Sequence, residues 1–228
     1  MIIRKALRKT GIITTSWDDG FYLDVRLAEL LDKYFIKGTF YIPNKFTNKL
    51  LNKYQIRAIA RHHEIGAHSL THKDLTKLNS KQLISEIKDS KSYLEDIIQR
   101  DIKMFAYPFG RFNNRVKKVL KISNFLGART IDGLDPKISD PFEFGISLGV
   151  NVSKISLENW FWLTSITARH TVASKAIWHL AGHSWEIEYF NMWKTLERFF
   201  KYIKGLDKKT YLTNGEVIQR RVNAKYFI

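Results

Sequence analysis

Short β-branched segments alternate with amphipathic segments along most of this chain. The first pair is the nearly uncharged run G-I-I-T-T at 11–15, followed by apolar residues at helical spacing over 21–35. Alternation of this kind favours a parallel sheet whose strands are joined by right-handed helical crossovers. Further strands are expected at 38–42, 64–67, 103–107, 127–131, 145–150, 175–181 and 211–213. Helices are expected between them, the longest starting after Asn79 or Ser80 and ending near 98.

The length and composition suit one α/β domain over residues 1–228. A chain of 228 residues with 44% hydrophobic content can bury a sizeable core, and this length also fits an α/β barrel. The sequence contains no cysteine, which excludes disulfides and thiolate ligands. Any transition-metal site must therefore use His, Asp or Glu.

The net charge of +16 would attract polyanions such as nucleic acid, anionic lipid surfaces or acidic glycans. The basic residues are spread along the chain and form no nucleic-acid motif, so we expect no specific nucleic-acid partner. Contact with an anionic surface or an acidic glycan stays open. Residues 1–10 contain no apolar run long enough for a signal peptide or membrane span. We therefore expect a cytoplasmic location, extending at most to a membrane surface.

Two adjacent carboxylates, Asp18 and Asp19, follow the first expected strand. The carboxyl ends of strands are where α/β folds build active sites, so this pair is a candidate site. The tripeptide Asp18-Asp19-Gly20 is also ordinary turn chemistry, because Asp bonds its own backbone and Gly accepts positive φ. Taken alone, it is more typical of a plain turn.

His68 and His72 are four residues apart, a spacing that lets two imidazoles converge on one ion. Such a pair arises often by chance, so it needs a third ligand. Asp18 and Asp19 offer one, and two His with one carboxylate is a recognised catalytic metal set. His63 competes as a ligand, but the residues after it read as the start of a strand.

Several segments, in this order, resemble the motifs of polysaccharide deacetylases with a NodB-homology domain, carbohydrate esterase family four. The segments are S-W-D-D-G at 16–20, H-S-L-T-H at 68–72, F-A-Y-P-F-G at 105–110, the strand ending at His183, and the closing run at 211–217. The resemblance implies a distorted (β/α) barrel with fewer than eight complete strands. It also implies a metal-dependent amidase that removes acetyl groups from N-acetylated sugars.

The resemblance carries roles onto matching positions. It implies Asp19, His68 and His72 as metal ligands, Asp18 as general base and His183 as general acid. The third motif would meet the substrate at Tyr107 and Pro108, with the backbone N–H of Tyr107 binding the oxyanion.

The sequence departs from the family pattern at three places. Ala106 stands where the family has an Arg, the segment 132–136 lacks a Trp, and Ala181 replaces a Leu. We predict that Arg129 replaces the missing Arg, provided that its strand turns it toward Asp18 for a bidentate contact. Trp17 and Trp185 could rebuild an apolar wall for the substrate, although a buried Trp is more often core.

The expected function is metal-dependent N-deacetylation of an amino sugar, in a glycan or in a nucleotide- or lipid-linked precursor. Zinc suits the ligand set best, and other first-row divalent ions would also suit it. One alternative is removal of a formyl or other small acyl group by the same chemistry. Another is a non-catalytic glycan- or polyanion-binding barrel that keeps the metal pocket.

Overall fold

The computed structural model describes residues 11–135, 137–151 and 155–225. The expectation for residues 1–10 therefore falls outside the described residues. All strand pairings in the main sheet are parallel, in the order β6-β5-β4-β3-β2-β1-β8-β7, with β9 paired to the start of β1. The strands are β1 (Gly11–Asp18), β2 (Gly38–Ile42), β3 (Glu64–Ala67), β4 (Met104–Ala106), β5 (Gly127–Gly133), β6 (Phe144–Ile146), β7 (Leu148–Gly149), β8 (Ile177–His183) and β9 (Lys209–Tyr211).

One short segment nearly closes this sheet into a barrel. Its first half, β6, pairs with β5, and its second half, β7, pairs with β8. Between them, the N–H of Ser147 donates to the carbonyl of His179 at 2.9 Å. The predicted single strand at 145–150 is therefore wrong, because the chain changes partner at Ser147. The predicted fold class, a distorted (β/α) barrel with incomplete strands, is confirmed.

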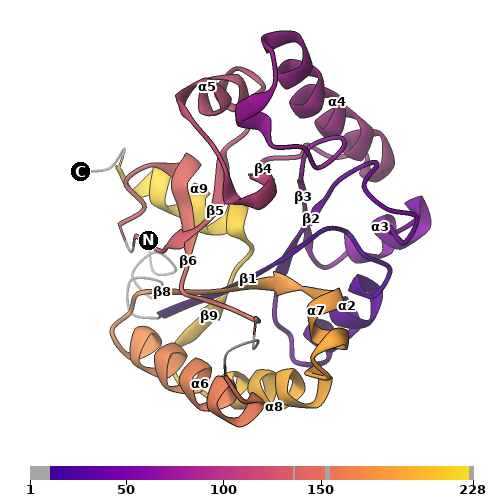
Figure 1. The fold of residues 1–228 in the computed structure, drawn as a ribbon. Helices are drawn as coiled ribbons and strands as arrows, with labels where there is room; N and C mark the ends of the chain where they lie inside the picture. Colours follow the sequence, from indigo (N-terminus) through magenta and orange to yellow (C-terminus); the bar gives the residue numbers. More distant parts are fainter. Residues whose placement is uncertain (1–10, 136, 152–154, 226–228) are drawn as a thin grey trace.

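Helices surround the barrel, and the last of them lies across the end where the strands begin, since its first residue, Asn214, donates to the inward-facing Thr14 (Figure 1). They are α2 (Asp24–Lys33), α3 (Lys53–Ile59), α4 (Ser80–Ile98), α5 (Asn114–Ile122), α6 (Leu157–Ala173), α7 (Ser184–Tyr189), α8 (Trp193–Lys204) and α9 (Asn214–Lys225). The start of α4 is fixed by a reciprocal cap, in which Asn79 accepts from the N–H of Gln82 and the Gln82 side chain accepts from the N–H of Asn79. Among the described residues, no helix combines the length and the apolar character needed to cross a bilayer.

Side chains of β1 alternate between the barrel interior and the surrounding helices. Thr14, Ser16 and Asp18 point inward, where they contact Asn214, His179 and Arg129 respectively. On the other side of the strand, Ile13 and Trp17 belong to the main hydrophobic core. The strand extends to Asp18, beyond the predicted end at 15, because it pairs with β8 up to the partners Asp18 and His183. This register brings both residues to the same edge of the barrel.

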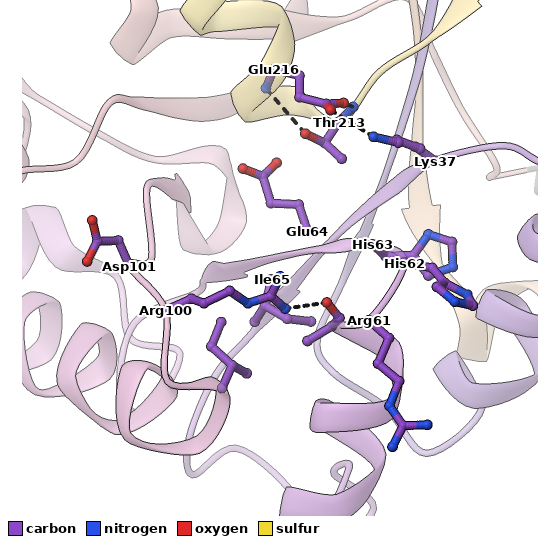
Figure 2. Close-up of a pocket in the computed structure, with 12 residues that line it drawn as sticks. Lys37, Arg61, His62, His63, Glu64, Ile65, Arg100, Asp101, Thr213 and Glu216 are labelled. Carbon is purple, nitrogen blue, oxygen red and sulfur yellow. Dashed lines mark hydrogen bonds and ion pairs between the residues drawn. The ribbon is translucent and has the colours of Figure 1, made fainter.

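A pocket of about 300 Å³ lies at the opposite end, where the strands begin (Figure 2). Lys37 and Glu216 form an ion pair there at 2.7 Å. His63 lines this pocket and accepts a hydrogen bond from the N–H of Gly38 at 3.2 Å. His63 precedes β3 and His68 follows it, so the two histidines lie at opposite ends of the barrel.

Candidate metal and acid–base site

Three of the predicted ligands meet at the carboxyl end of the barrel. Asp19 follows β1, and His68 and His72 lie in the loop after β3. Their potential ligand atoms all lie within 4.8 Å of one another. The Oδ1 atom of Asp19 is 3.8 Å from Nε2 of His68 and 3.5 Å from Nε2 of His72. The structure thus selects Asp19 as the carboxylate of the cluster.

The side chains of this cluster have the protonation states and the unpaired ligand atoms that a bound cation requires. Nδ1 of His68 bonds the carbonyl of Ala106 at 2.9 Å, so it carries the proton and leaves Nε2 as an acceptor facing Asp19. Burial lowers the pKa of His68 to about 4 and also lowers that of His72, which keeps both rings in the neutral, ligand-competent form. Oδ1 of Asp19 is buried and has no hydrogen-bond partner among the described residues. These features fit a divalent metal ion.

A glutamate from α4 holds the histidine loop in shape. Glu86 is buried and accepts from both the N–H and the hydroxyl of Thr71, the residue before His72. Within the loop, the hydroxyl oxygen of Ser69 accepts from the N–H of His72 at 2.9 Å. Sequence reasoning missed Glu86, because a Glu in a long amphipathic helix resembles an ordinary surface charge.

Arg129 reaches Asp18 from β5 through its Nη2 atom, and its side chain is almost completely buried. Burial of Asp18, the largest single influence, would raise its pKa, but Arg129, His68 and His183 together outweigh that effect and lower the pKa to about 2. The predicted bidentate contact is wrong, because only Nη2 bonds the carboxylate and the buried Nε has no partner among the described residues. The guanidinium instead lies 5.5 Å from the ring centroid of Tyr41.

His183 ends β8 and faces both aspartates. Its Nε2 atom is 4.0 Å from Oδ2 of Asp18 and 3.8 Å from Oδ2 of Asp19. Its Nδ1 atom bonds Glu186 at 2.8 Å. Burial of His183 would lower its pKa, but the bond to Glu186 and the nearby carboxylates raise the pKa to about 9. The imidazole is therefore protonated at neutral pH and can donate from Nε2.

Glu186 was missed in the sequence. It lies in the first turn of α7, three residues after His183, and is 8% exposed. The sequence could have indicated Glu186 by its position in the first turn of a helix that directly follows a strand. An acidic side chain in that position can turn back toward the preceding residues.

The two tryptophans have different positions. Trp185 is 39% exposed, and its Nε1 donates to Oδ2 of Asp19 at 2.9 Å. Its ring also lies 5.0 Å from that of His183. Trp17 is fully buried in the core, and its Nε1 donates to the hydroxyl of Thr15 at 3.1 Å. The prediction that Trp17 meets the substrate is wrong, because strand alternation turns it away from Asp18 and toward the helices.

The structure contradicts the substrate contacts predicted for the segment 105–110. The N–H of Tyr107 donates to the carbonyl of Arg129 at 3.2 Å, so it is not available for an oxyanion. The Tyr107 side chain and Pro108 are both buried, which contradicts the predicted substrate contacts. Phe109 is the exposed residue of this turn, at 56% exposure with a positive φ of 59°. Its ring lies 4.8 Å from the ring of His72.

The chain is similar to known deacetylases in sequence and in fold. It is 29% identical over 104 residues to a bifunctional xylanase/deacetylase of Pseudobutyrivibrio xylanivorans, an alignment covering 45% of this chain and 17% of that protein. A crystal structure from Mycobacterium smegmatis, provisionally named a polysaccharide deacetylase, superposes with a TM-score of 0.76 at 15% identity, covering 95% of this chain and 92% of the other.

A family 4 pseudoenzyme from Bacillus anthracis also shares the fold, with a TM-score of 0.59 at 16% identity, covering 92% of this chain and 66% of that one. The chain spans about half or less of the length of the curated relatives it matches. The family model for polysaccharide deacetylase matches residues 6–130, more than half of the sequence. The chain therefore belongs to the polysaccharide deacetylase family.

Proposed function

We propose that this chain is a metal-dependent hydrolase that removes N-acetyl groups from an amino sugar, in a glycan or in its nucleotide- or lipid-linked precursor. The proposal rests on one observation. Asp19, His68 and His72 lie at the same edge of the barrel as an ionised Asp18 and a protonated His183. Binding alone requires neither a base nor an acid, whereas amide hydrolysis requires both.

The metal would be held by Asp19, His68 and His72. When bound, a divalent cation acts as a Lewis acid toward the amide carbonyl and makes a coordinated water more acidic. Nitrogen and oxygen donors without a thiolate suit zinc, and other first-row divalent ions fit the same set.

Asp18 is proposed to accept the proton of the attacking water. Its Oδ2 atom is bound by Arg129, while the buried Oδ1 has no hydrogen-bond partner among the described residues. One oxygen therefore fixes the orientation of the carboxylate and the other is left to receive a proton. The low pKa of Asp18, which Arg129, His68 and His183 together produce against the effect of burial, keeps this group ionised before the reaction.

His183 is proposed to donate a proton to the departing nitrogen. An amine anion is a poor leaving group, so C–N cleavage needs an acid at that atom. Glu186 occupies Nδ1 of His183, which directs the donating Nε2 toward the aspartates. When the proton moves to the leaving nitrogen, the products are acetate and a free amino sugar.

Aromatic rings beside the metal cluster support a sugar substrate. Phe46 and Phe109 flank the ring of His72, with ring centroids at 4.4 Å and 4.8 Å, and both are about half exposed. Aromatic faces are suitable contacts for the apolar C–H faces of a pyranose ring. The arrangement favours a carbohydrate over a small unattached amide.

The second candidate is a non-catalytic glycan-binding barrel. The pseudoenzyme with a similar fold and the absence of the family's Arg and Trp at their usual positions motivate this alternative. The contacts of Arg129 with Asp18 and of Glu186 with His183 favour catalysis, because both acid–base groups have a charged partner.

The test is release of acetate from N-acetylated amino sugars offered as oligomers and as nucleotide- or lipid-linked forms. Metal-loaded protein should release acetate, chelated protein should not, and added zinc should restore release. A parallel formate assay with N-formyl sugars addresses the small-acyl alternative. Asp18→Asn should keep the metal and lose about 10²- to 10⁴-fold in turnover. Full activity of that variant, or activity indifferent to metal, would contradict the proposal.

A further inference from the structure

The outer face of α6 presents three apolar side chains to solvent. Trp162 is 52% exposed, and Leu163 and Ile166 are each 46% exposed. Their three- and four-residue spacing places them together, while Trp160 and Ala168 on the opposite face are buried in the core. The outer face of a surface helix usually carries polar residues instead. A contiguous apolar group of this kind indicates an interaction surface.

A row of cations lies beside this apolar group. α8 packs next to α6 (Figure 1), and Arg198 of α8 reaches over the ring of Phe161 on α6 at 3.8 Å. The exposed cations of α8 recur at helical spacing and form one stripe, and the last outward turn of α6 adds two more basic side chains. The α8 residues are Lys194, Arg198 and Lys201, and the α6 residues are Arg169 and His170. Lys204 of α8 points instead over the ring of Phe35, which follows α2.

The acidic residues of the same surface are compensated. Glu158 is paired with Arg198 at 2.7 Å. Glu197 is paired with Lys33 of α2. Within the described residues, neither Lys194 nor Lys201 forms an ion pair, so the surface of the two helices carries a positive excess.

We propose that this α6–α8 face binds anionic phospholipid membranes. Trp162, Leu163 and Ile166 would enter the boundary between headgroups and acyl chains, and the α8 stripe would face the headgroups. An apolar row containing Trp and Leu beside a row of Lys and Arg is the pattern of helices that lie in a membrane interface. Anionic lipid attracts each nearby cation, which complements the charge of α8.

Other occupants fit this face less well. A symmetric contact between two copies centred on α6 would bring two cationic α8 stripes to one interface, where they repel. A soluble polyanion would bind the cations but leave the apolar row in water. Of these three occupants, a membrane surface is the one that satisfies both rows together, and the inference does not depend on the reaction catalysed.

The experiment is flotation of the full chain with vesicles of phosphatidylcholine, with and without phosphatidylglycerol. Binding should require phosphatidylglycerol and weaken at high salt. Lys194→Gln with Lys201→Gln should lower the partition coefficient roughly twenty-five-fold, at about fivefold per cation. The matched control is Lys81→Gln with Lys88→Gln, which removes the same charge at the same seven-residue spacing from the exposed face of α4. That control should bind almost as the unaltered chain does.

A second pair of variants tests the apolar row. Ile166→Ser should weaken binding about fivefold, whereas Ile84→Ser on α4, where Ile84 is 38% exposed, should not. Circular dichroism and thermal melting confirm that each variant is folded. Equal losses for the α8 and α4 variants, or equal binding to uncharged vesicles, would overturn the proposal. So would a vesicle-independent dimer that Ile166→Ser dissociates.

Discussion

The metal side and the acid–base side of the site are built in different ways. The three candidate ligands come from segments within residues 6–130, which match the family model, and two of them are four residues apart. Each acid–base group depends in addition on a charged partner: Arg129, also within the matched segment, approaches Asp18 across 111 residues, whereas Glu186, outside that segment, approaches His183 from the helix directly after β8. The metal side thus needs its three side chains only to meet at one barrel edge, whereas each acid–base group also needs an oppositely charged partner, which comes from a distant strand for Asp18 and from the next helix for His183.

The largest expected effect is the loss of metal and activity when a ligand is removed. His68→Ala removes a ligand whose tautomer is fixed by the carbonyl of Ala106, so the protein should lose its metal. Losing Lewis-acid stabilisation worth several kcal/mol corresponds to a rate loss on the order of 10³-fold or more. Metal analysis and acetate release measure this. His63→Ala, at the far end of β3, is the control and should keep both metal and activity, and equal loss in the two variants would dismiss the assigned ligand.

The next effect tests the support of the base. Arg129→Lys keeps a charge but loses the planar group beside Tyr41, so turnover should fall roughly 10- to 100-fold with the metal retained. Arg129 lowers the pKa of Asp18 against the effect of burial, so weaker support raises that pKa. Because the base must be ionised, the acid limb of the pH–rate profile should move to higher pH. An unchanged limb with unchanged turnover would assign Arg129 a structural role only.

Glu186→Gln tests the support of the acid, with a loss of about tenfold at neutral pH as expected for a group that orients a catalytic residue. Burial lowers the pKa of His183, but Glu186 and the aspartates raise it to about 9. Activity that needs the protonated imidazole is lost as pH rises through this pKa. Removing the charge of Glu186 lowers the pKa, so the alkaline limb should move to lower pH. An unchanged alkaline limb would contradict the role of Glu186 in raising the pKa of His183.

The smallest effect compares the two tryptophans. Trp185→Phe removes the donor to Asp19 and should raise the metal dissociation constant about tenfold, with little change in turnover at saturating metal. Trp17→Phe removes a core hydrogen bond to Thr15, which costs about 1 kcal/mol of unfolding free energy and leaves metal affinity unchanged. Chelator competition and thermal melting measure the pair. If Trp17→Phe weakened metal binding as much as Trp185→Phe, the assignment of Trp17 to the core alone would be wrong.

Much of the secondary structure and the metal cluster could be predicted from local patterns. The bounds predicted for β2 and β3 are those that the structure has. The spacing of His68 and His72 identified a ligand pair because four residues fit within one curled loop. The resemblance then selected Asp19 over Asp18, and the structure places Asp19 against both histidines. The strand bounds and the histidine pair depend on neighbours in sequence, so the sequence by itself determined them, whereas Asp19 meets the histidines only through the pairing of β1 with β2 and of β2 with β3.

The remaining features needed the tertiary structure. A strand side chain reverses its direction with each residue, so whether Arg129 or Trp17 faces the barrel interior depends on the phase of pairing with other strands. Likewise, the N–H of Tyr107 bonds Arg129, and the chain changes partner at Ser147, because adjacent strands lie within hydrogen-bond reach only after the barrel assembles. The sequence determined which groups the site has, and long-range strand pairing decided which of them meet.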